Sequence, residues 1–406
     1  MPANRQLRQI VVVGAGVAGM GAAEALRRDG YDGALTIVGA ERHAPYHRPP
    51  LSKKLLSGQV HRAGIDMAPQ FDMDARVLRG ATAVGLDMST RSVEVRDTGQ
   101  NLSLSFDGLV IASGAEPREW PGGPAPDGVL LLRTVDDCLA IRERLGARPR
   151  VVVVGGGFIG SEVAATCRVL GLDVVLVEKA AGPLVQALGA ELAPCWAKLH
   201  RDHGVKLRVG VGVDEFVGNG RVEAVRLTDG SKVPADVVIV GLGVTPATAW
   251  LEGSGLHLDD GVVCDATGAA EGKNTGDGNV VAAGDVARWW HPLYERHLRT
   301  EHWDDALRQG EAAARTLLAG PEHAEAFDAV PYFWSDQYDV KLQMVGVPTD
   351  YDAVEIIEGK PDSWEFVAAY GRGGRTIAVL ATIPGRVYAY REAIEKRAAF
   401  PPSRPD

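Results

Sequence analysis

Residues 10–13 read Ile-Val-Val-Val, and residues 14–19 continue the stretch as Gly-Ala-Gly-Val-Ala-Gly. A short β-branched run predicts a buried strand, and glycines spaced G-x-G-x-x-G predict a tight turn into a helix. The same course returns at residues 151–160, where four valines precede Gly-Gly-Gly-Phe-Ile-Gly. The chain therefore carries two strand–turn–helix segments of one design.

The likeness of the two segments extends past the turns. Ala23 and Ala164 each lie four residues after the third glycine of their turn, where a small side chain allows a helix to approach a sheet. Gly30 and Gly171 suit the left-handed geometry that ends a helix. Apolar runs then follow at residues 35–38 and 174–177. Continuous apolar strands alternating with helices predict an α/β fold with parallel sheets covered on both faces.

A turn of this kind, between a strand and a helix, is typical of a dinucleotide site. The first glycine allows the turn, the second lets a pyrophosphate approach the backbone, and the third lets the helix pack on the strand. Two such turns indicate two dinucleotide cofactors that exchange electrons. The glycines concerned are Gly14, Gly16 and Gly19 in the first turn, and Gly155, Gly157 and Gly160 in the second.

An acidic residue follows each of the two second strands. Glu41 and Glu178 stand where a carboxylate can accept the ribose hydroxyls of an adenosine and repel a 2′-phosphate. Glu178 therefore favours NAD over NADP, although the adjacent Lys179 could assist a phosphate. The alternative for either glutamate is a solvated charge at the end of a strand.

The composition limits the classes of partner. A chain of 406 residues predicts two or three domains. The net charge of −10 argues against nucleic acid or an anionic membrane as the main partner. No apolar run is long enough to span a bilayer, and the polar N-terminus lacks the pattern of a signal peptide. We therefore expect a cytoplasmic protein.

The four cysteines are scattered, with no C-x-x-C pair and no metal-binding spacing. We interpret Cys138, Cys167, Cys195 and Cys264 as small apolar residues of a reduced compartment, and we expect no metal site.

The order of elements predicts a division into domains. Residues 76–113 resemble short strands and turns, residues 237–240 and 280–283 resemble buried strands, and residues 303–318 resemble a long helix. Aromatic-rich strands follow from about residue 331. We expect one dinucleotide-binding domain of residues 1–113 and 246–325, a second of residues 114–245, and a smaller α+β C-terminal domain of residues 326–406.

Several motifs resemble those of the FAD-dependent ferredoxin reductases of bacterial oxygenase and cytochrome P450 systems, which share the glutathione reductase architecture. The most specific one is Ala-Pro-Tyr-His-Arg-Pro-Pro-Leu-Ser-Lys at residues 44–53. Others lie at residues 112–114, where the usual threonine is Ser113, and at residues 132–134, 241–244, 284–285 and 333–337. The resemblance covers essentially the whole chain.

The resemblance implies roles for individual residues. The first turn and Glu41 would hold the ADP part of FAD, Asp285 would bind its ribityl or pyrophosphate region, and Lys53 would lie beside the flavin ring. The other FAD residues implied are Ala83, Arg48, Arg133, Gly284, His302 and Trp303. Glu162 would lie near the nicotinamide of NADH and could pair with Lys53. The other NAD residues implied are Phe158, Ile159, Glu178 and Gly243, with the glycines of the second turn.

Some of these residues have simpler interpretations. Lys53 could be an ordinary surface lysine, although the Pro49-Pro50 pair before it stiffens its segment. Trp303 and Trp334 could be core aromatic residues, and Asp285 could cap the helix that follows it.

The segment 45–53 stands where disulfide reductases of this architecture carry their redox cysteine pair. The resemblance therefore implies an NADH-dependent reductase in which the flavin passes electrons singly to a [2Fe–2S] ferredoxin, which serves a cytochrome P450 or a Rieske oxygenase. The alternatives are a rubredoxin reductase, an NADH oxidase, or a flavoprotein interaction factor that senses NADH.

An acidic ferredoxin needs a local positive surface on this acidic chain. The cations that could form it, each of which could equally be an ordinary solvated charge, are Arg48, Lys53, Lys54, Arg296, Arg299, Arg386 and Arg391. The resemblance also implies that this chain is a monomer or a weak homodimer.

Overall fold

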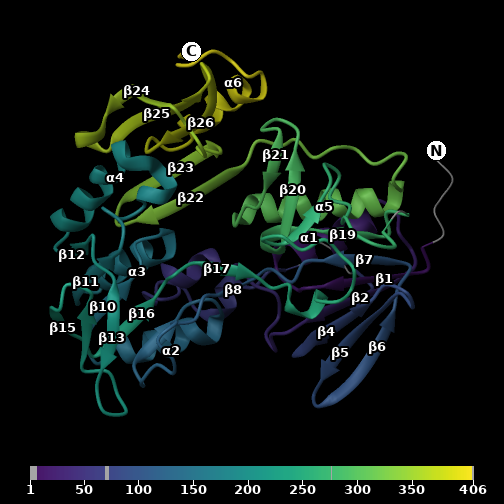
Figure 1. Cartoon of the computed structure of the whole chain (residues 1–406), viewed down its shortest axis with the longest axis horizontal. Helices are drawn as coiled ribbons and strands as arrows, with labels where there is room; N and C mark the ends of the chain where they lie inside the picture. The colour runs from purple at the N-terminus through teal and green to yellow at the C-terminus, as the bar shows by residue number, and fades with distance from the viewer. Residues whose placement is uncertain (1–6, 69–72, 276, 405–406) are drawn as a thin grey trace. The chain divides into compact units, whose positions relative to one another are not determined.

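The computed structural model describes residues 7–68, 73–275 and 277–404 (Figure 1). The chain forms two compact units. The first comprises residues 1–47, 66–116 and 245–331, and the second comprises residues 48–65, 117–244 and 332–406. The expected three-domain division stays a prediction. The two compact units differ from it by placing residues 48–65 and the C-terminal strands with the second glycine turn.

The first unit is built on a five-stranded parallel sheet with the order β19-β7-β1-β2-β3. Its three central strands are apolar and almost fully buried, as the continuous valine and isoleucine runs predict. The strands are β1 (Gln9–Val13), β2 (Ala34–Gly39), β3 (Arg76–Arg79), β7 (Gly108–Ile111) and β19 (Val280–Ala282).

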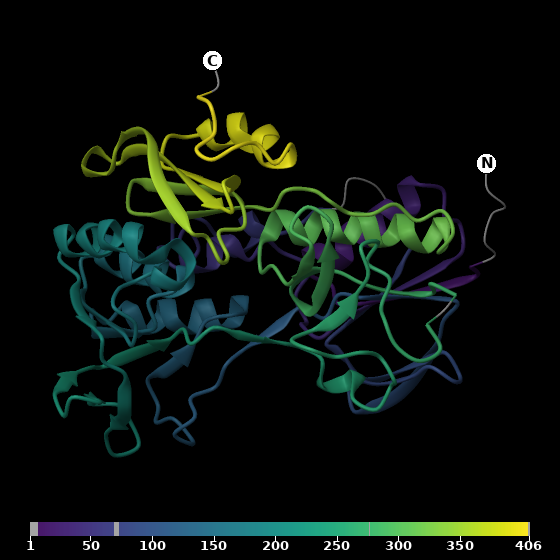
Figure 2. The ribbon, with the colours of Figure 1, turned by 45° about the horizontal axis from the view of Figure 1, so that its top comes forward.

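Two helices of the first unit, α1 (Val17–Arg28) and α5 (Trp303–Ala319), pack closely against each other although they are far apart in the sequence. A Cβ added at Gly310 would lie 2.2 Å from the carbonyl oxygen of Ala18, and one at Gly21 would lie 2.7 Å from Leu307. Glycine is therefore what allows the two backbones to approach. Figure 2 shows α5 as the long green helix.

Smaller sheets complete the first unit. An antiparallel sheet contains β4 (Ala81–Asp87), β5 (Ser92–Asp97) and β6 (Gln100–Ser105). A mixed sheet contains β18 (Val262–Cys264), which is parallel to β20 (Ala287–His291), and β21 (Arg296–Leu298), which is antiparallel to β20. The short helices η3 (Ala249–Leu251) and η4 (Gly284–Val286) also belong to this unit. The chain passes between the units at β8 (Ala115–Pro117) and β17 (Val244–Pro246).

The second unit repeats the parallel design with the strand order β12-β11-β10-β16-β9. Its strands are β9 (Val129–Leu131), β10 (Arg150–Val154), β11 (Asp173–Glu178), β12 (Lys206–Val209) and β16 (Val237–Val240). Its helices are α2 (Val135–Leu145), α3 (Phe158–Val169) and α4 (Val185–Asp202). A small antiparallel sheet adds β13 (Val213–Val217), β14 (Ala224–Leu227) and β15 (Lys232–Pro234).

The helices that follow the two glycine turns end in the same way. The N–H of Tyr31 donates to Leu26 and that of Leu172 donates to Cys167, each across a preceding glycine. Those glycines, Gly30 and Gly171, have φ angles of +94° and +76°. The left-handed helix ends that the sequence predicted are confirmed.

The C-terminal part of the second unit is a five-stranded antiparallel sheet with the order β22-β23-β26-β25-β24, drawn in yellow-green in Figure 2. Its strands are β22 (Tyr332–Gln337), β23 (Val340–Gly346), β24 (Ala353–Lys360), β25 (Glu365–Arg372) and β26 (Arg375–Ala381). The short helices of the second unit are η1 (Pro49–Ser52), η2 (Arg62–Ile65), η5 (Pro361–Ser363), η6 (Arg386–Tyr390) and α6 (Arg391–Glu395). Strand β22 packs against α3, so the C-terminal sheet adjoins the second glycine turn.

Candidate functional site: two dinucleotide turns and a buried ion pair

The three glycines of the first turn differ in what a side chain at their position would meet. Gly14 has φ +121°, and a Cβ there would lie 1.9 Å from the carbonyl oxygen of Ala112. A Cβ at Gly19 would lie 1.8 Å from the carbonyl oxygen of Gly14, whereas one at Gly16 would meet nothing within 4 Å. The outer glycines are required by the fold itself. The middle one faces open space.

The second turn repeats this division. Gly155 has φ +98°, and a Cβ there would lie 2.1 Å from the carbonyl oxygen of Gly241. A Cβ at Gly160 would lie 2.0 Å from Gly155, and one at Gly157 would meet nothing within 4 Å.

In both turns the middle glycine, Gly16 or Gly157, is the N-cap of the following helix, with no side-chain cap bond. The N–H groups of the first helical turn are then available to an anion. Open space in front of a helix N-terminus fits a pyrophosphate, so both turns fit a dinucleotide.

The two strand-end carboxylates are held differently. Glu41 Oε2 accepts a hydrogen bond of 2.6 Å from the Tyr46 hydroxyl. Glu178 accepts two backbone bonds, from Gly156 N to Oε2 and from Ala180 N to Oε1, both of 2.6 Å. Each carboxylate oxygen keeps a further lone pair, so Glu178 can still accept a ribose hydroxyl while it holds the turn.

The remaining FAD candidates fall in both units. In the first unit Gly284 has φ +78° and its N–H donates to Gln309 Oε1 at 2.9 Å. His302 is the N-cap of α5 and lies 3.1 Å from Asp305 through Nδ1, and the ring of Trp303 lies 5.4 Å from that of His47. Ala83 lies in β4 against the core of this unit.

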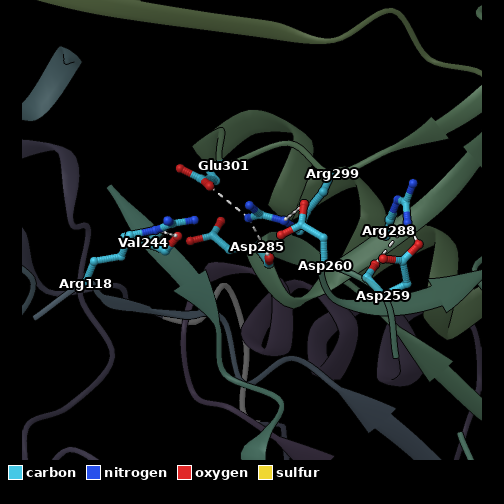
Figure 3. Close-up of polar contacts among 8 residues, drawn as sticks. All are labelled: Arg118, Val244, Asp259, Asp260, Asp285, Arg288, Arg299 and Glu301. Carbon is cyan, nitrogen blue, oxygen red and sulfur yellow. Dashed lines mark hydrogen bonds and ion pairs between the residues drawn. The ribbon is translucent and has the colours of Figure 1, made fainter. Parts of the chain in front are cut away.

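Asp285 is braced by an arginine for which the sequence suggested a different role. Arg299 Nη1 donates to the carbonyl oxygen of Asp285 at 3.3 Å and to Glu301 at 2.8 Å, and Nε lies 3.1 Å from Asp260 (Figure 3). The Arg299 side chain is only 11% exposed. It is therefore committed inside the first unit and is a poor candidate for a docking cation, because it is largely buried and already paired with two carboxylates.

Arg48 and Arg133 lie together in the second unit. Arg48 Nη1 donates to the carbonyl oxygen of Arg133 at 2.5 Å. Arg133 precedes α2, where Asp137 accepts from the backbone N–H groups of Arg133 and Thr134 in a capping box. The cap of α2 therefore fixes the backbone at Arg133.

Lys53 and Glu162 form the ion pair that the sequence analysis suggested. Lys53 Nζ lies 2.9 Å from Glu162 Oε2, and the two side chains are 15% and 3% exposed. Ser52 Oγ donates to the same oxygen at 2.6 Å, and Ser335 Oγ donates to Oε1 at 2.7 Å. A buried carboxylate thus has donors on both oxygens and a cation beside it, as a buried charge requires. Sequence reasoning gave no role to Ser52 or to Ser335.

The other NAD candidates lie around the second turn. Phe158 begins α3 and contacts the edge of Phe333 with ring centroids 4.9 Å apart, and Ile159 is 49% exposed. Gly243 has φ +86°. Its carbonyl oxygen accepts from Arg118 N at 3.0 Å, and Arg118 Nε donates to Val244 at 3.1 Å (Figure 3). Arg118 was not anticipated, since an exposed arginine carries no local signal.

The four cysteines are free thiols. Burial raises the pKa of both Cys138 and Cys167 to about 12, and that of Cys264 well above its usual value. Buried thiols with raised pKa values are poor nucleophiles, so they behave as packing residues.

Comparison with known proteins agrees with this geometry. Residues 8–310 match the model of the pyridine nucleotide-disulphide oxidoreductases, and residues 332–405 match the reductase C-terminal domain. The chain belongs to the pyridine nucleotide-disulphide oxidoreductase family. It is an oxidoreductase with the glutathione reductase-like fold, and the cofactors of the family are FAD and NADH.

Relatives within this family are ferredoxin reductases. The putidaredoxin reductase of Pseudomonas putida is 34% identical over 380 residues, covering 91% of this chain and 87% of the relative. The ferredoxin–NAD(+) reductase component of the anthranilate 1,2-dioxygenase system of Burkholderia cepacia is 37% identical over 385 residues, covering 93% and 91%. The reductase in the covalent putidaredoxin reductase–putidaredoxin complex superposes with a TM-score of 0.89 at 32% identity, covering 96% of this chain and 93% of that one.

Among the described residues, no helix of this family member is long and apolar enough to cross a bilayer.

Proposed function

We propose that this chain oxidises NADH and delivers the electrons, through FAD, one at a time to a [2Fe–2S] ferredoxin that serves a cytochrome P450 or a Rieske oxygenase. The observation that carries the proposal is the pair of glycine turns, each open at its middle glycine. The resemblance adds that residues 45–53, which contain no cysteine, stand where disulfide reductases carry their redox cysteine pair. The relatives named as ferredoxin reductases support the same acceptor.

The residues of the first turn, with Glu41, Ala83, Gly284, Asp285, His302 and Trp303, would hold FAD together with Arg48, Lys53 and Arg133. The residues of the second turn, with Phe158, Ile159, Glu178 and Gly243, would hold NADH. Flavin chemistry supplies what this acceptor needs, because a flavin takes two electrons from a nicotinamide and releases them singly.

The residues of the chain would bind the two cofactors and orient them. The helix N-termini at Gly16 and Gly157 would place partial positive charge beside each pyrophosphate. The Glu162 carboxylate fixes the position of the positively charged Lys53 ammonium. Because the two charges cancel, the pair as a whole is neutral in its buried surroundings. A fixed cation of this kind favours negative charge that develops beside it.

Anaerobic rapid mixing tests the function. The purified yellow protein is mixed with NADH, and flavin bleaching is followed. The reduced protein is then mixed with a [2Fe–2S] ferredoxin. We expect fast bleaching and then ferredoxin reduction at a rate that supports turnover. Fast oxygen consumption without a protein acceptor would indicate an oxidase, and preferential transfer to rubredoxin would indicate a rubredoxin reductase. A long-lived reduced complex that never turns over would indicate a sensor.

The docking of ferredoxin is expected to depend on salt. Since the chain has a net charge of −10, an acidic ferredoxin needs a local basic surface, to which the exposed Lys54 could contribute. Raising the ionic strength from about 0.05 to 0.5 M should slow ferredoxin reduction severalfold and leave flavin reduction by NADH unchanged. Ferredoxin turnover that is insensitive to salt would contradict electrostatic docking.

The cytoplasmic location and the monomeric or weakly dimeric state stay predictions from the sequence. Sedimentation of the flavin-loaded protein over a range of concentrations tests the second.

A further inference from the structure

Glu162 receives its donors from segments that are far apart in the chain. The carboxylate belongs to α3. Ser52 is the last residue of η1 and Lys53 follows it, whereas Ser335 lies in β22 of the C-terminal sheet. Ser335 and Glu162 are 173 residues apart in sequence, and their side chains are 1% and 3% exposed. Two of the donors therefore come from one side of the carboxylate, and the third comes from a different part of the fold.

The Ser335 hydroxyl has a defined direction. Gln337 Nε2 donates to Ser335 Oγ at 3.3 Å, and Ser335 Oγ lies 2.7 Å from Glu162 Oε1. A hydroxyl has one proton to donate, and here its oxygen already accepts from an amide, so the proton is directed to the carboxylate. Gln337, which is 1% exposed, thus orients Ser335, and Ser335 orients Glu162.

The opposite side of Glu162 is fixed by the backbone. The Ser52 carbonyl oxygen accepts a bond of 2.8 Å from Thr166 Oγ1, which lies one turn after Glu162 on α3. The Leu51 carbonyl oxygen accepts a bond of 3.1 Å from Cys138 Sγ in α2. The end of η1 is therefore tied to two helices of the second unit. The Ser335 bond is the contact through which the C-terminal sheet reaches the same carboxylate.

We propose that Ser335 is a positioning residue, oriented by Gln337, which holds the Glu162 carboxylate and through it the Lys53 ammonium. The C-terminal sheet then contributes to the reaction of NADH by fixing the ion pair. The kinetic effect that we expect rests on the proposed function. The positioning of the Lys53 ammonium can be tested without the cofactors and does not depend on that function.

The reactivity of Lys53 is a readout that does not require the cofactors. An ammonium held against a carboxylate is acylated slowly, whereas Lys54, the exposed neighbour, serves as an internal reference in the same peptide region. Trace labelling with an acylating reagent, read by peptide mass spectrometry, gives the ratio of Lys53 to Lys54 labelling. We expect Ser335→Ala to raise this ratio severalfold. Ser335→Thr, which keeps the hydroxyl, should restore it.

The kinetic readout is the limiting rate of flavin reduction by NADH under anaerobic conditions. We expect Ser335→Ala to lower this rate about tenfold, since the loss of one hydrogen bond to a buried charge commonly has an effect of this size. The KM for NADH should change much less. The FAD content should equal that of the wild type. The matched control is Ser363→Ala, which removes an exposed hydroxyl in η5, the short helix between β24 and β25, where it donates to the carbonyl oxygen of Lys360.

Gln337→Met keeps the experiment decisive if Ser335→Ala does not fold, because it removes the amide that orients Ser335 and keeps the Ser335 hydroxyl itself. Its effects should have the same direction and be smaller. Wild-type labelling ratios in both variants would overturn the proposal, as would altered labelling with an unchanged reduction rate. If NADH fails to reduce the wild-type flavin, the proposed function is wrong, while the labelling ratios still report on the positioning of Lys53.

Discussion

The two glycine turns have the same backbone and different acidic residues. Gly14 and Gly155 both have a positive φ, and both middle glycines face open space. Yet Glu41 is held by a tyrosine hydroxyl, whereas Glu178 accepts the backbone N–H groups of Gly156 and Ala180. Two copies of one sequence motif can therefore differ in the hydrogen bonds that hold their acidic residues. Glu178 thus stabilises the backbone of its own turn, and Glu41 is bonded to the side chain of Tyr46.

The largest expected effect comes from the third glycine of each turn. In Gly19→Ala and Gly160→Ala the new methyl group would lie 1.8 and 2.0 Å from a backbone oxygen, which cannot move without opening the turn. We expect each variant to lower the free energy of unfolding by about 3 kcal/mol or more. Thermal unfolding followed by circular dichroism measures the loss. A variant with wild-type stability would contradict the equivalence of the two turns.

The middle glycines should separate the two cofactors without unfolding either unit. A methyl group at Gly16 or Gly157 meets no protein atom within 4 Å, so it should affect only a bound pyrophosphate. Gly16→Ala should weaken FAD retention by about 10–100-fold, and Gly157→Ala should raise the KM for NADH by a similar factor with FAD content intact. Each variant is the control for the other. If both lose FAD, the assignment of the second turn to NADH is wrong.

Acid should destabilise both units through buried histidines. In the second unit burial lowers the pKa of His200 from 6.5 to about 4, and in the first unit burial also lowers the pKa of His291. Between the two pKa values the unfolded chain binds a proton that the folded chain does not, so stability falls as the pH falls from 6.5 toward 4. For His200 the loss between pH 7 and pH 5 is about 2 kcal/mol.

His200→Gln keeps a side chain that can bond the Tyr338 hydroxyl and removes the titration. Urea unfolding at pH 7 and pH 5 should show a smaller loss in this variant, and His291→Gln should change the loss in the same direction. An identical pH dependence in wild type and His200→Gln would exclude His200 as the source.

The smallest expected effect concerns coenzyme choice. Glu178→Ala removes the charge that repels a 2′-phosphate and should narrow the preference for NADH over NADPH about fivefold. It also removes two bonds from the turn, so both KM values should rise, and the KM for NADH should rise more than the KM for NADPH. Glu41→Ala is the matched control and should leave the NADH to NADPH ratio unchanged. An unchanged ratio in Glu178→Ala would remove this residue from the ribose site.

Local patterns predicted the parallel sheets well. The apolar run at residues 237–240 has the bounds of β16, and the helix expected from Trp303 begins there. Buried strands and glycine turns can be recognised in a sequence because each is determined by a few consecutive residues. The left-handed helix ends at Gly30 and Gly171 were visible for the same reason.

Long-range contacts were not predictable in this way. The grouping of residues 48–65 with the second unit runs against their place in the sequence, beside the first strands. The Ser335–Glu162 bond joins residues 173 positions apart, and no periodicity encodes it. Arg299 suggested a surface cation from its sequence, because one of its two acidic partners, Asp260, lies 39 residues away and only the fold brings it close.

The close packing of α1 and α5 bears on how the protein is made. The first helix to be synthesised rests on a helix that begins at Trp303, and the strand β19, which completes the first sheet, comes at residues 280–282. The central sheet of the second unit, by contrast, is encoded within residues 129–240. On the ribosome, the sheet that would accept NADH is therefore complete before the sheet that would accept FAD, although the flavin sequence emerges first. We therefore expect capture of the flavin to be a late event in biosynthesis, and chains truncated before residue 280 to accumulate without colour.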